Sequence, residues 1–201
     1  AKRLAGEGYA VLCPNPFYRV GKAPTFGSDF DFTKPEGRAQ AMAAAGPLQA
    51  AGAAERDATA YIAWLDSQAA VKKTAKIGTT GYCMGGPLVM RTAATIPARI
   101  GSVNSFHGGG LVTDKPDSPH TMISKMKADF LICVADNDDQ REPAVKDTLK
   151  AAFAASKLAA EIEVYKGANH GWCVPGSAVY NQASAEKAWD RLLAHLKKAL
   201  V

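Results

Sequence analysis

The sequence lacks several features that mark specialised classes of protein. None of its apolar runs approaches the roughly 18 residues that a membrane-spanning helix needs, and no signal-peptide pattern is visible. Its 24 lysines and arginines exceed its 19 aspartates and glutamates, for a net charge of +5, but they form no long block of like charge. We therefore expect neither a membrane nor a nucleic acid as a partner. The oligomeric state is not readable from the sequence.

Cysteine is scarce as well. The chain has 4 cysteines and no C-x-x-C pair, a spacing that suits neither a zinc site nor a dense disulfide framework. We therefore expect free thiols, a reducing and hence cytoplasmic location, and no metal site. Two of the four, Cys13 and Cys133, lie inside apolar runs and are expected to be inert core thiols.

The length and composition fit one globular domain. The 201 residues are 47% hydrophobic and 21% charged, which is enough for a sizeable core and argues against disorder. We therefore predict a single domain over residues 1–201. Because the first residue is Ala1 rather than methionine, we also expect this domain to be incomplete at its N-terminus.

The chain alternates between short strand-like and longer helical patterns. The predicted strands are β-type runs of four to eight residues, several of them apolar almost throughout, at 8–14, 75–81, 100–106, 129–135 and 160–166. Helical spacing of apolar residues predicts helices at 54–68, 87–96, 143–158 and 184–200, the last with Ser184 as N-cap. This alternation predicts an α/β fold, with a mostly parallel sheet covered by helices on both faces. Two stretches, 17–47 and 108–121, are predicted to be surface loops.

The stretch "TTGYCMGG" at 79–86 carries the most specific chemistry. It follows a predicted strand and precedes a predicted helix, the setting of a nucleophile elbow, here with Cys83 as the nucleophile. We expect side chains at Gly81 and Gly85 to collide with the neighbouring strand and helix. The turn would place the thiol at a helix N-terminus, where the helix dipole favours the thiolate. A buried cysteine at a glycine-rich strand end is the structural alternative.

An acid and a base follow the thiol in the order that a hydrolytic triad requires. The segment "DNDDQREP" comes after the strand at 129–135, and "GANHGW", with His170, comes after the strand at 160–166. Loops at the carboxyl ends of parallel strands share one edge of the sheet, so the three groups can converge. The acid could be Asp136, Asp138 or Asp139. We predict Asp138, because the strand fixes where the side chain points.

The other histidines give weaker signals. His107 precedes three glycines and could line the same cleft, although a structural role is the favoured interpretation. His120 is expected to be structural, and His195 is expected to be solvated on the last helix.

Several motifs together resemble the dienelactone hydrolase (carboxymethylenebutenolidase) family. They are "GYAVLCPNPFYR" (8–19), "ERD" (55–57), "GTTGYCMGG" (78–86), "VADNDD" (134–139), "GANHGW" (167–172) and the final helix with Trp189. The resemblance implies an α/β-hydrolase fold and a Cys–His–Asp triad without a cofactor. It implies Cys83 as nucleophile, His170 as base and Asp138 as the residue that orients it. The backbone N–H of Met84 would be an oxyanion-hole donor, and Arg19 would bind a substrate carboxylate.

The sequence departs from the family pattern in two places. Val174 stands where type members have a second carboxylate-binding arginine, which argues against a dienelactone as substrate. The strand and loop that supply the other oxyanion donor and a glutamate near the thiol would precede Ala1. We therefore predict a hydrolase that cleaves a small ester or lactone through a thioester intermediate.

Two functions of other classes remain open. One is a redox-active thiol protein, with Cys173 as resolving thiol for Cys83. The other is a noncatalytic binding module on a hydrolase scaffold.

Overall fold

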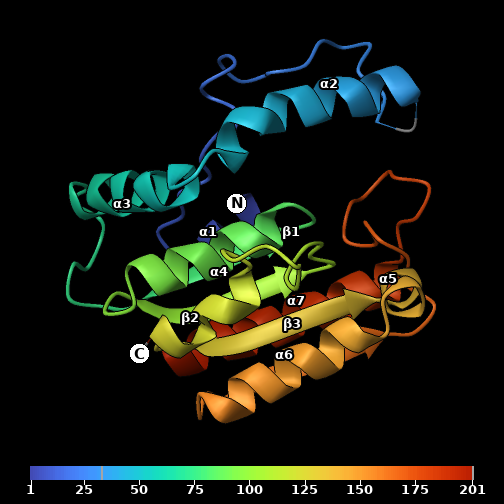
Figure 1. Ribbon diagram of the computed structural model, residues 1–201. Coiled ribbons are helices and arrows are strands. Elements are labelled where there is room, and N and C mark those ends of the chain that lie inside the picture. The colour runs from blue at the N-terminus through green and yellow to red at the C-terminus, as the bar shows by residue number, and fades with distance from the viewer. Residues whose placement is uncertain (33, 201) are drawn as a thin grey trace. The chain divides into compact units, whose positions relative to one another are not determined.

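The computed structural model describes residues 1–32 and 34–200 (Figure 1). The chain divides into two compact units, Ala1–Lys73 and Thr74–Val201. Each unit is described by itself below. The prediction of one domain over 1–201 stays a prediction.

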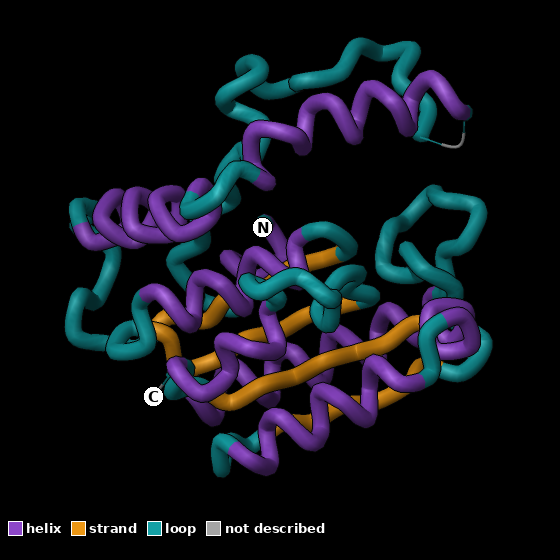
Figure 2. Tube along the Cα trace, viewed as in Figure 1, coloured by secondary structure: helices purple, strands orange, loops and turns teal. Residues whose placement is uncertain are grey.

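The larger unit is built on a four-stranded sheet. Its strands are β1 (Ile77–Tyr82), β2 (Ile100–Phe106), β3 (Asp129–Ala135) and β4 (Ala160–Tyr165). Figure 2 shows these strands in orange, lying side by side. Their order in the sheet follows the chain, and every neighbouring pair is parallel. Four of the five predicted strands are thereby confirmed. Because all strands run the same way, their carboxyl ends meet at one edge of the sheet.

Helices cover both faces of this sheet, as predicted. Helices α4 (Gly85–Thr95) and α6 (Ala144–Ala155) join neighbouring parallel strands, while α7 (Gln182–Ala199) follows β4 (Figure 1). A Cβ on Gly78 would lie 2.3 Å from Leu196 of α7, whereas a Cβ on Gly81 would lie 2.2 Å from the carbonyl of Gly85 in α4. Residues 78 and 81 point to opposite faces of β1 because side chains alternate along a strand. Helices α4 and α7 therefore pack on opposite faces.

Two helices of the larger unit bury apolar residues that recur at helical spacing. Leu149 and Phe153 of α6 are buried, as are Leu192 and Leu196 of α7. The predicted cap of the last helix is wrong. The cap is Asn181, whose Oδ1 accepts a hydrogen bond from the backbone N–H of Ser184 at 3.0 Å. An amide oxygen caps as well as a hydroxyl, so the cap lies three residues before the predicted Ser184.

The smaller unit contains helices α1 (Lys2–Gly6), α2 (Pro35–Ala45) and α3 (Ala53–Asp66), and the 3-10 helix η1 (Gly46–Gln49). Helix α3 confirms the prediction for 54–68, with Ala58 and Ile62 buried. Helix α2 lies inside the predicted loop at 17–47. Its alanine-rich sequence has no apolar stripe, and the pattern therefore gave no helical signal.

The strand predicted at 8–14 is absent from the structure. Residues 9–15 are irregular, and Cys13 is exposed rather than a core thiol. A strand needs a hydrogen-bonded neighbour, and the described residues of the smaller unit form no other strand. The apolar run therefore has no partner there, and its composition alone does not make it a strand.

Candidate active site

The thiol of Cys83 lies on a strained turn between β1 and α4. Its backbone φ is +51°, in the left-handed region that non-glycine residues rarely adopt. Two backbone hydrogen bonds hold the turn: Cys83 N–H donates to Phe106 O at 3.1 Å, and Gly86 N–H donates to Cys83 O at 3.1 Å. The turn leaves the cysteine exposed at the carboxyl edge of the sheet. Backbone strain of this kind is often found at functional sites.

Two glycines allow this turn to form, but they are not the predicted pair. A Cβ on Gly81 would lie 2.2 Å from Gly85 O, and one on Gly86 would lie 2.7 Å from Ser105 Oγ and 2.8 Å from Gly108 Cα. A Cβ on Gly85 would meet nothing within 4 Å. The expectation of a collision is therefore right for Gly81 and wrong for Gly85. Gly86 is the second crowded position, because it faces the loop after β2.

The structure brings the predicted acid and base to the thiol. His170 lies in the loop after β4, and Nδ1 of its ring is 2.6 Å from Oδ2 of Asp138. The other side of the ring hydrogen-bonds the Cys83 thiol. Asp138 lies within the short helix α5 (Asp136–Arg141), not in the open loop that the sequence suggested. Thiol, imidazole and carboxylate thus form one continuous row.

The pKa values of the thiol and the imidazole shift in opposite directions. The hydrogen bond with His170 lowers the pKa of Cys83, against the partial desolvation of its sulfur, and the Met84 backbone contributes a further hydrogen bond to the sulfur. The bond to Cys83 raises the pKa of His170 to about 9, again against burial and with support from Asp138. Opposite shifts of this kind favour a thiolate–imidazolium pair, and the thiolate is the nucleophilic form of cysteine.

The neighbouring carboxylates are engaged elsewhere. Asp136 accepts hydrogen bonds from Gly167 N–H and from the Lys166 ammonium, each at 3.0 Å. Asp139 pairs with Lys146 at 2.7 Å. Of the three aspartates that the sequence left open, Asp138 is the one whose carboxylate contacts His170.

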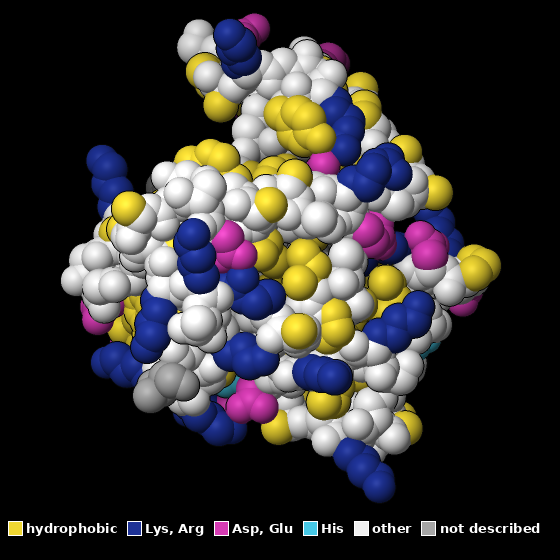
Figure 3. Space-filling view, turned by 90° about the vertical axis from the view of Figure 1, so that its left-hand side faces the viewer, with side chains coloured by type: hydrophobic (Ala, Val, Ile, Leu, Met, Phe, Trp, Pro, Cys, Tyr) yellow, Lys and Arg dark blue, Asp and Glu magenta, His cyan; other side chains and the backbone are white. Residues whose placement is uncertain are grey.

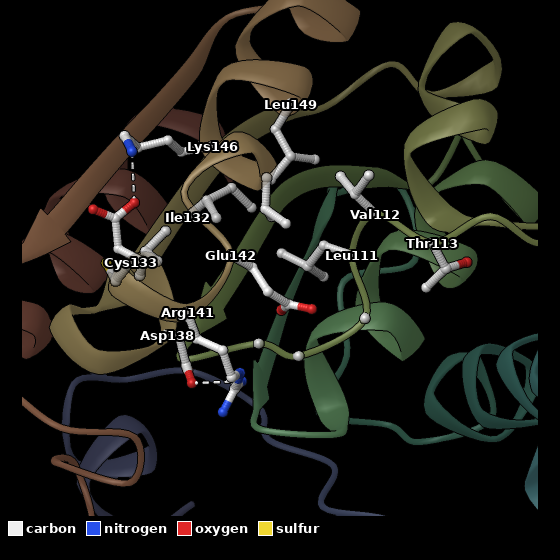
Figure 4. A pocket seen from close by; sticks show the side chains of 16 residues that line it. Leu111, Val112, Thr113, Ile132, Cys133, Asp138, Arg141, Glu142, Lys146 and Leu149 are labelled. Carbon is white, nitrogen blue, oxygen red and sulfur yellow. Dashed lines mark hydrogen bonds and ion pairs between the residues drawn. The ribbon is translucent and has the colours of Figure 1, made fainter.

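Asp138 has a second partner and lies beside a cavity. Its Oδ1 accepts a hydrogen bond from Arg141 at 3.0 Å. A cavity of about 110 Å³ next to this pair has apolar walls that include Leu111, Val112 and Leu149 (Figure 4). Its lining includes Asp138 but neither Cys83 nor His170, so it lies on the acid's side of the site.

Asn137 contacts the loop that carries His170, although no sequence motif pointed to it. Its side-chain Oδ1 accepts a hydrogen bond from the backbone N–H of His170 at 2.8 Å. The only signal was an amide within a run of acids, which says nothing about the partner. This contact depends on helix α5 meeting the loop after β4 in the folded chain.

His107 lies directly beside His170. Its ring is 4.9 Å from the His170 ring and 5.0 Å from that of Trp172, measured between centroids. It is 2% exposed, and among the described residues neither ring nitrogen has a hydrogen-bond partner. Burial, together with the nearby His170, lowers the pKa of His107 to about 4. The residue is therefore a neutral wall of the site at physiological pH.

The structure corrects the prediction for His195. Its Nδ1 lies 2.8 Å from both Ser102 Oγ and Asn104 Oδ1, on the buried strand β2, and burial lowers the pKa of His195. The histidine is thus a packing residue of α7, not a solvated one. His120 bonds Ser118 Oγ at 2.7 Å, which fits the structural role expected for it.

Arg19 makes a bidentate ion pair within the smaller unit. Its guanidinium donates to both oxygens of Asp57, at 2.7 and 2.8 Å, and Tyr18 O–H donates to the same carboxylate at 2.8 Å. Burial pushes the pKa of Asp57 up, but these hydrogen bonds outweigh it and leave the pKa lowered. Part of the donor capacity of Arg19 is therefore used inside the protein, and its role in substrate binding stays a prediction.

Cys173 is poorly suited to the role of a resolving thiol. Burial raises its pKa to about 12, so it remains protonated at neutral pH. A protonated thiol is a weak nucleophile in disulfide exchange. The redox alternative therefore lacks its second reactive cysteine.

Residues 1–32 and 34–200 lack the features of two other classes of site. No group of three or more His, Cys, Asp or Glu side chains is placed to hold a metal ion in that part of the chain. None of its helices combines the length and apolar character that crossing a membrane requires. On the face drawn in Figure 3, lysines and arginines are scattered and interspersed with acids rather than gathered in one patch.

Comparison with known proteins gives one consistent family. The model of the dienelactone hydrolase family matches residues 1–200. A protein of Escherichia coli K12 named "Putative carboxymethylenebutenolidase" is 27% identical, over 98% of this chain and 69% of its own length.

Solved structures show the same fold. A "Putative Dienelactone Hydrolase" from Klebsiella pneumoniae superimposes with a TM-score of 0.78 at 22% identity, over 98% of this chain and 78% of that one. A dienelactone hydrolase-like promiscuous phosphotriesterase from metagenomic libraries gives a TM-score of 0.77 at 19% identity, over 99% and 78%. At such identities the likeness shows the fold alone, which is that of the α/β-hydrolases.

Proposed function

Because the chain belongs to the dienelactone hydrolase family, we propose that it hydrolyses a carboxylic ester or lactone with Cys83 as the nucleophile. The observation that supports this most directly is the hydrogen-bonded row from Cys83 through His170 to Asp138. The pKa of the thiol is lowered and that of the imidazole is raised to about 9. This is the arrangement that nucleophilic catalysis by cysteine requires.

In the first half of the reaction the enzyme is acylated. The Cys83 thiolate adds to the substrate carbonyl carbon, and the carbonyl π electrons move onto oxygen. The Met84 N–H, which hydrogen-bonds the sulfur in the free protein, would then donate to this oxyanion. When the tetrahedral intermediate collapses, the C–O bond to the leaving group breaks. The His170 imidazolium gives that oxygen its proton, which leaves a thioester on Cys83.

The second half restores the thiolate. His170, now neutral, removes a proton from water as the water oxygen attacks the thioester carbonyl. Asp138 bonds Nδ1 and so leaves the other ring nitrogen for this proton. Collapse of the second intermediate breaks the C–S bond and releases the carboxylic acid. These steps use no cofactor, because His170 transfers every proton.

We favour an uncharged, apolar ester as substrate. Tyr82 and Met84 flank the thiol and are 43% and 38% exposed, and Val174 in the loop after His170 is 50% exposed. Exposed apolar side chains around a reactive group suit an apolar acyl or alkoxy group. An ester also has a better leaving group than an amide.

The decisive test compares wild type with Cys83→Ala on a simple aryl ester and on a dienelactone. Cys13→Ala is the matched control, because Cys13 is also an exposed cysteine but lies outside the row. We expect Cys83→Ala to abolish ester turnover and Cys13→Ala to retain it.

Other outcomes separate the alternatives. Equal turnover by wild type and Cys83→Ala would refute the cysteine hydrolase. Turnover of the ester but not of the dienelactone would support the class and the apolar substrate. Intact esters and lactones after incubation with wild type would favour a noncatalytic binding module.

A further inference from the structure

The backbone N–H of His170 makes its hydrogen bond outside the loop that carries the residue. His170 lies between β4, which ends at Tyr165, and α7, which begins at Gln182. Its own N–H donates to a side chain, Oδ1 of Asn137, at 2.8 Å and not to the backbone of its own loop. The position of the His170 backbone therefore depends on a residue from another element.

A row of hydrogen bonds ties this loop to the start of α5. Asp136 N–H donates to Ala168 O at 2.9 Å, while the Asp136 carboxylate accepts from Gly167 N–H. These bonds fix the loop before the histidine. The ring is held at the other end by Asp138, through Nδ1. Between them, Asn137 holds the backbone of His170 itself.

From this arrangement we infer that Asn137 is a positioning residue for His170, and the inference rests on the proposed function. Asp138 fixes Nδ1 of the His170 ring. The other ring nitrogen, Nε2, reaches the thiol of Cys83 only if the Cα of His170 is fixed as well. A reacting group displaced by about 1 Å can lose about 100-fold in rate. The Asn137 bond supplies the second fixed point.

The amide also has an electrostatic advantage over a fourth acid at this position. Asp136, Asp138 and Asp139 already follow β3. A carboxylate at 137 would still accept the N–H of His170, but it would add a negative charge beside the imidazolium. That charge would raise the pKa of His170 further and make it a weaker general acid. Asparagine supplies the acceptor without the charge.

The test uses Asn137→Ala, which removes the acceptor, and Asn137→Asp, which keeps the acceptor and adds a charge. Asn169→Ala is the matched control, because Asn169 is exposed and adjacent to His170 in the same loop. The probes are a small aryl ester for turnover and iodoacetamide for Cys83, with alkylation followed at that cysteine across pH.

We expect Asn137→Ala to lower kcat by about 10- to 100-fold with little change in KM. Its Cys83 should also be alkylated more slowly at neutral pH, because less thiolate is present. Asn137→Asp should recover most of the alkylation rate, and the change associated with His170 should move to a higher pH than in wild type. Asn169→Ala should match wild type in both measurements.

The inference fails if Asn137→Ala keeps the wild-type alkylation profile, or if Asn137→Asp is as impaired as Asn137→Ala. A purely structural role would lower the unfolding midpoint without the separate pH shift of Asn137→Asp, and that result would also overturn it. If wild type does not cleave the ester, the proposed function fails. The alkylation arm still decides the role of Asn137, because it needs no substrate.

Discussion

The glycines around Cys83 give the sharpest test of the local geometry. A Cβ on Gly81 would lie 2.2 Å from the carbonyl oxygen and 2.5 Å from the carbonyl carbon of Gly85. Both are backbone atoms of α4, which cannot move aside as the end of a side chain could. A Cβ on Gly85 would meet nothing within 4 Å, although the two glycines flank the cysteine symmetrically in sequence. Alanine should therefore have opposite effects at the two positions.

The expected magnitudes follow from these distances. Overpacking by one methyl group costs about 1–3 kcal/mol, and a contact with backbone at 2.2 Å places the cost of Gly81→Ala at about 3 kcal/mol. With a urea dependence of about 2 kcal/mol per molar, the unfolding midpoint should fall by about 1.5 M. Gly85 lies in the first turn of α4, where alanine is a better helix former. Gly85→Ala should therefore be neutral or gain up to about 1 kcal/mol.

The assay is urea unfolding of both variants beside wild type, combined with the rate of Cys83 alkylation. In Gly81→Ala, the rate of Cys83 alkylation should also differ from that of wild type, because the turn that exposes the thiol must shift. Gly86→Ala provides a second crowded position, with Gly108 Cα 2.8 Å away. A loss of stability in Gly85→Ala equal to that in Gly81→Ala would refute the packing argument.

Three further predictions concern the charged groups. Because the pKa of His170 is raised to about 9, the imidazolium that supports the thiolate persists below that pH. In His170→Gln this support is lost, so the rate of Cys83 alkylation, measured against pH, should rise as it does for an ordinary cysteine thiol. Asp138→Asn should lower kcat by about 10- to 1000-fold, whereas Asp139→Asn, which only frees Lys146, should stay within about threefold in the same ester assay. Asp57→Ala should destabilise the protein by about 2–4 kcal/mol in urea unfolding, because it leaves the Arg19 guanidinium without its buried partner. Loss of turnover of a carboxylate-bearing ester in Arg19→Ala but not in Asp57→Ala, with turnover of an uncharged ester retained in both, would favour the predicted role of Arg19 in binding a substrate carboxylate.

The alternation of strands and helices in the larger unit could be predicted from the sequence, because it depends on the residues within each short segment. Strand β3 is apolar almost throughout, as a parallel strand buried on both faces tends to be, and both β2 and β3 have the bounds that the sequence predicted. The run at 8–14 has the same composition, yet it is irregular. Strand formation depends on a neighbouring strand, and composition cannot report whether that neighbour is present.

The chemistry of the candidate site was partly readable for the same reason. The order of thiol, acid and base along the chain, together with the parallel sheet, was enough to expect Cys83, an aspartate and His170 at one edge. Among the three neighbouring aspartates, Asp138 was predicted from its distance in sequence to the end of the strand. The contact with His170 belongs to Asp138, while Asp139 turns to Lys146.

The sequence by itself determined which residue types follow each strand, because that order is written in the chain. It could not determine that Gly86 rather than Gly85 is crowded, that His107 is buried with no hydrogen-bond partner among the described residues, or that Asn137 holds the backbone of His170. Gly86, His107 and Asn137 each owe their role to a residue from another element: Ser105, Trp172 and His170. Such contacts were decided only by the tertiary structure, because two segments far apart in sequence must first pack before either acquires its partner.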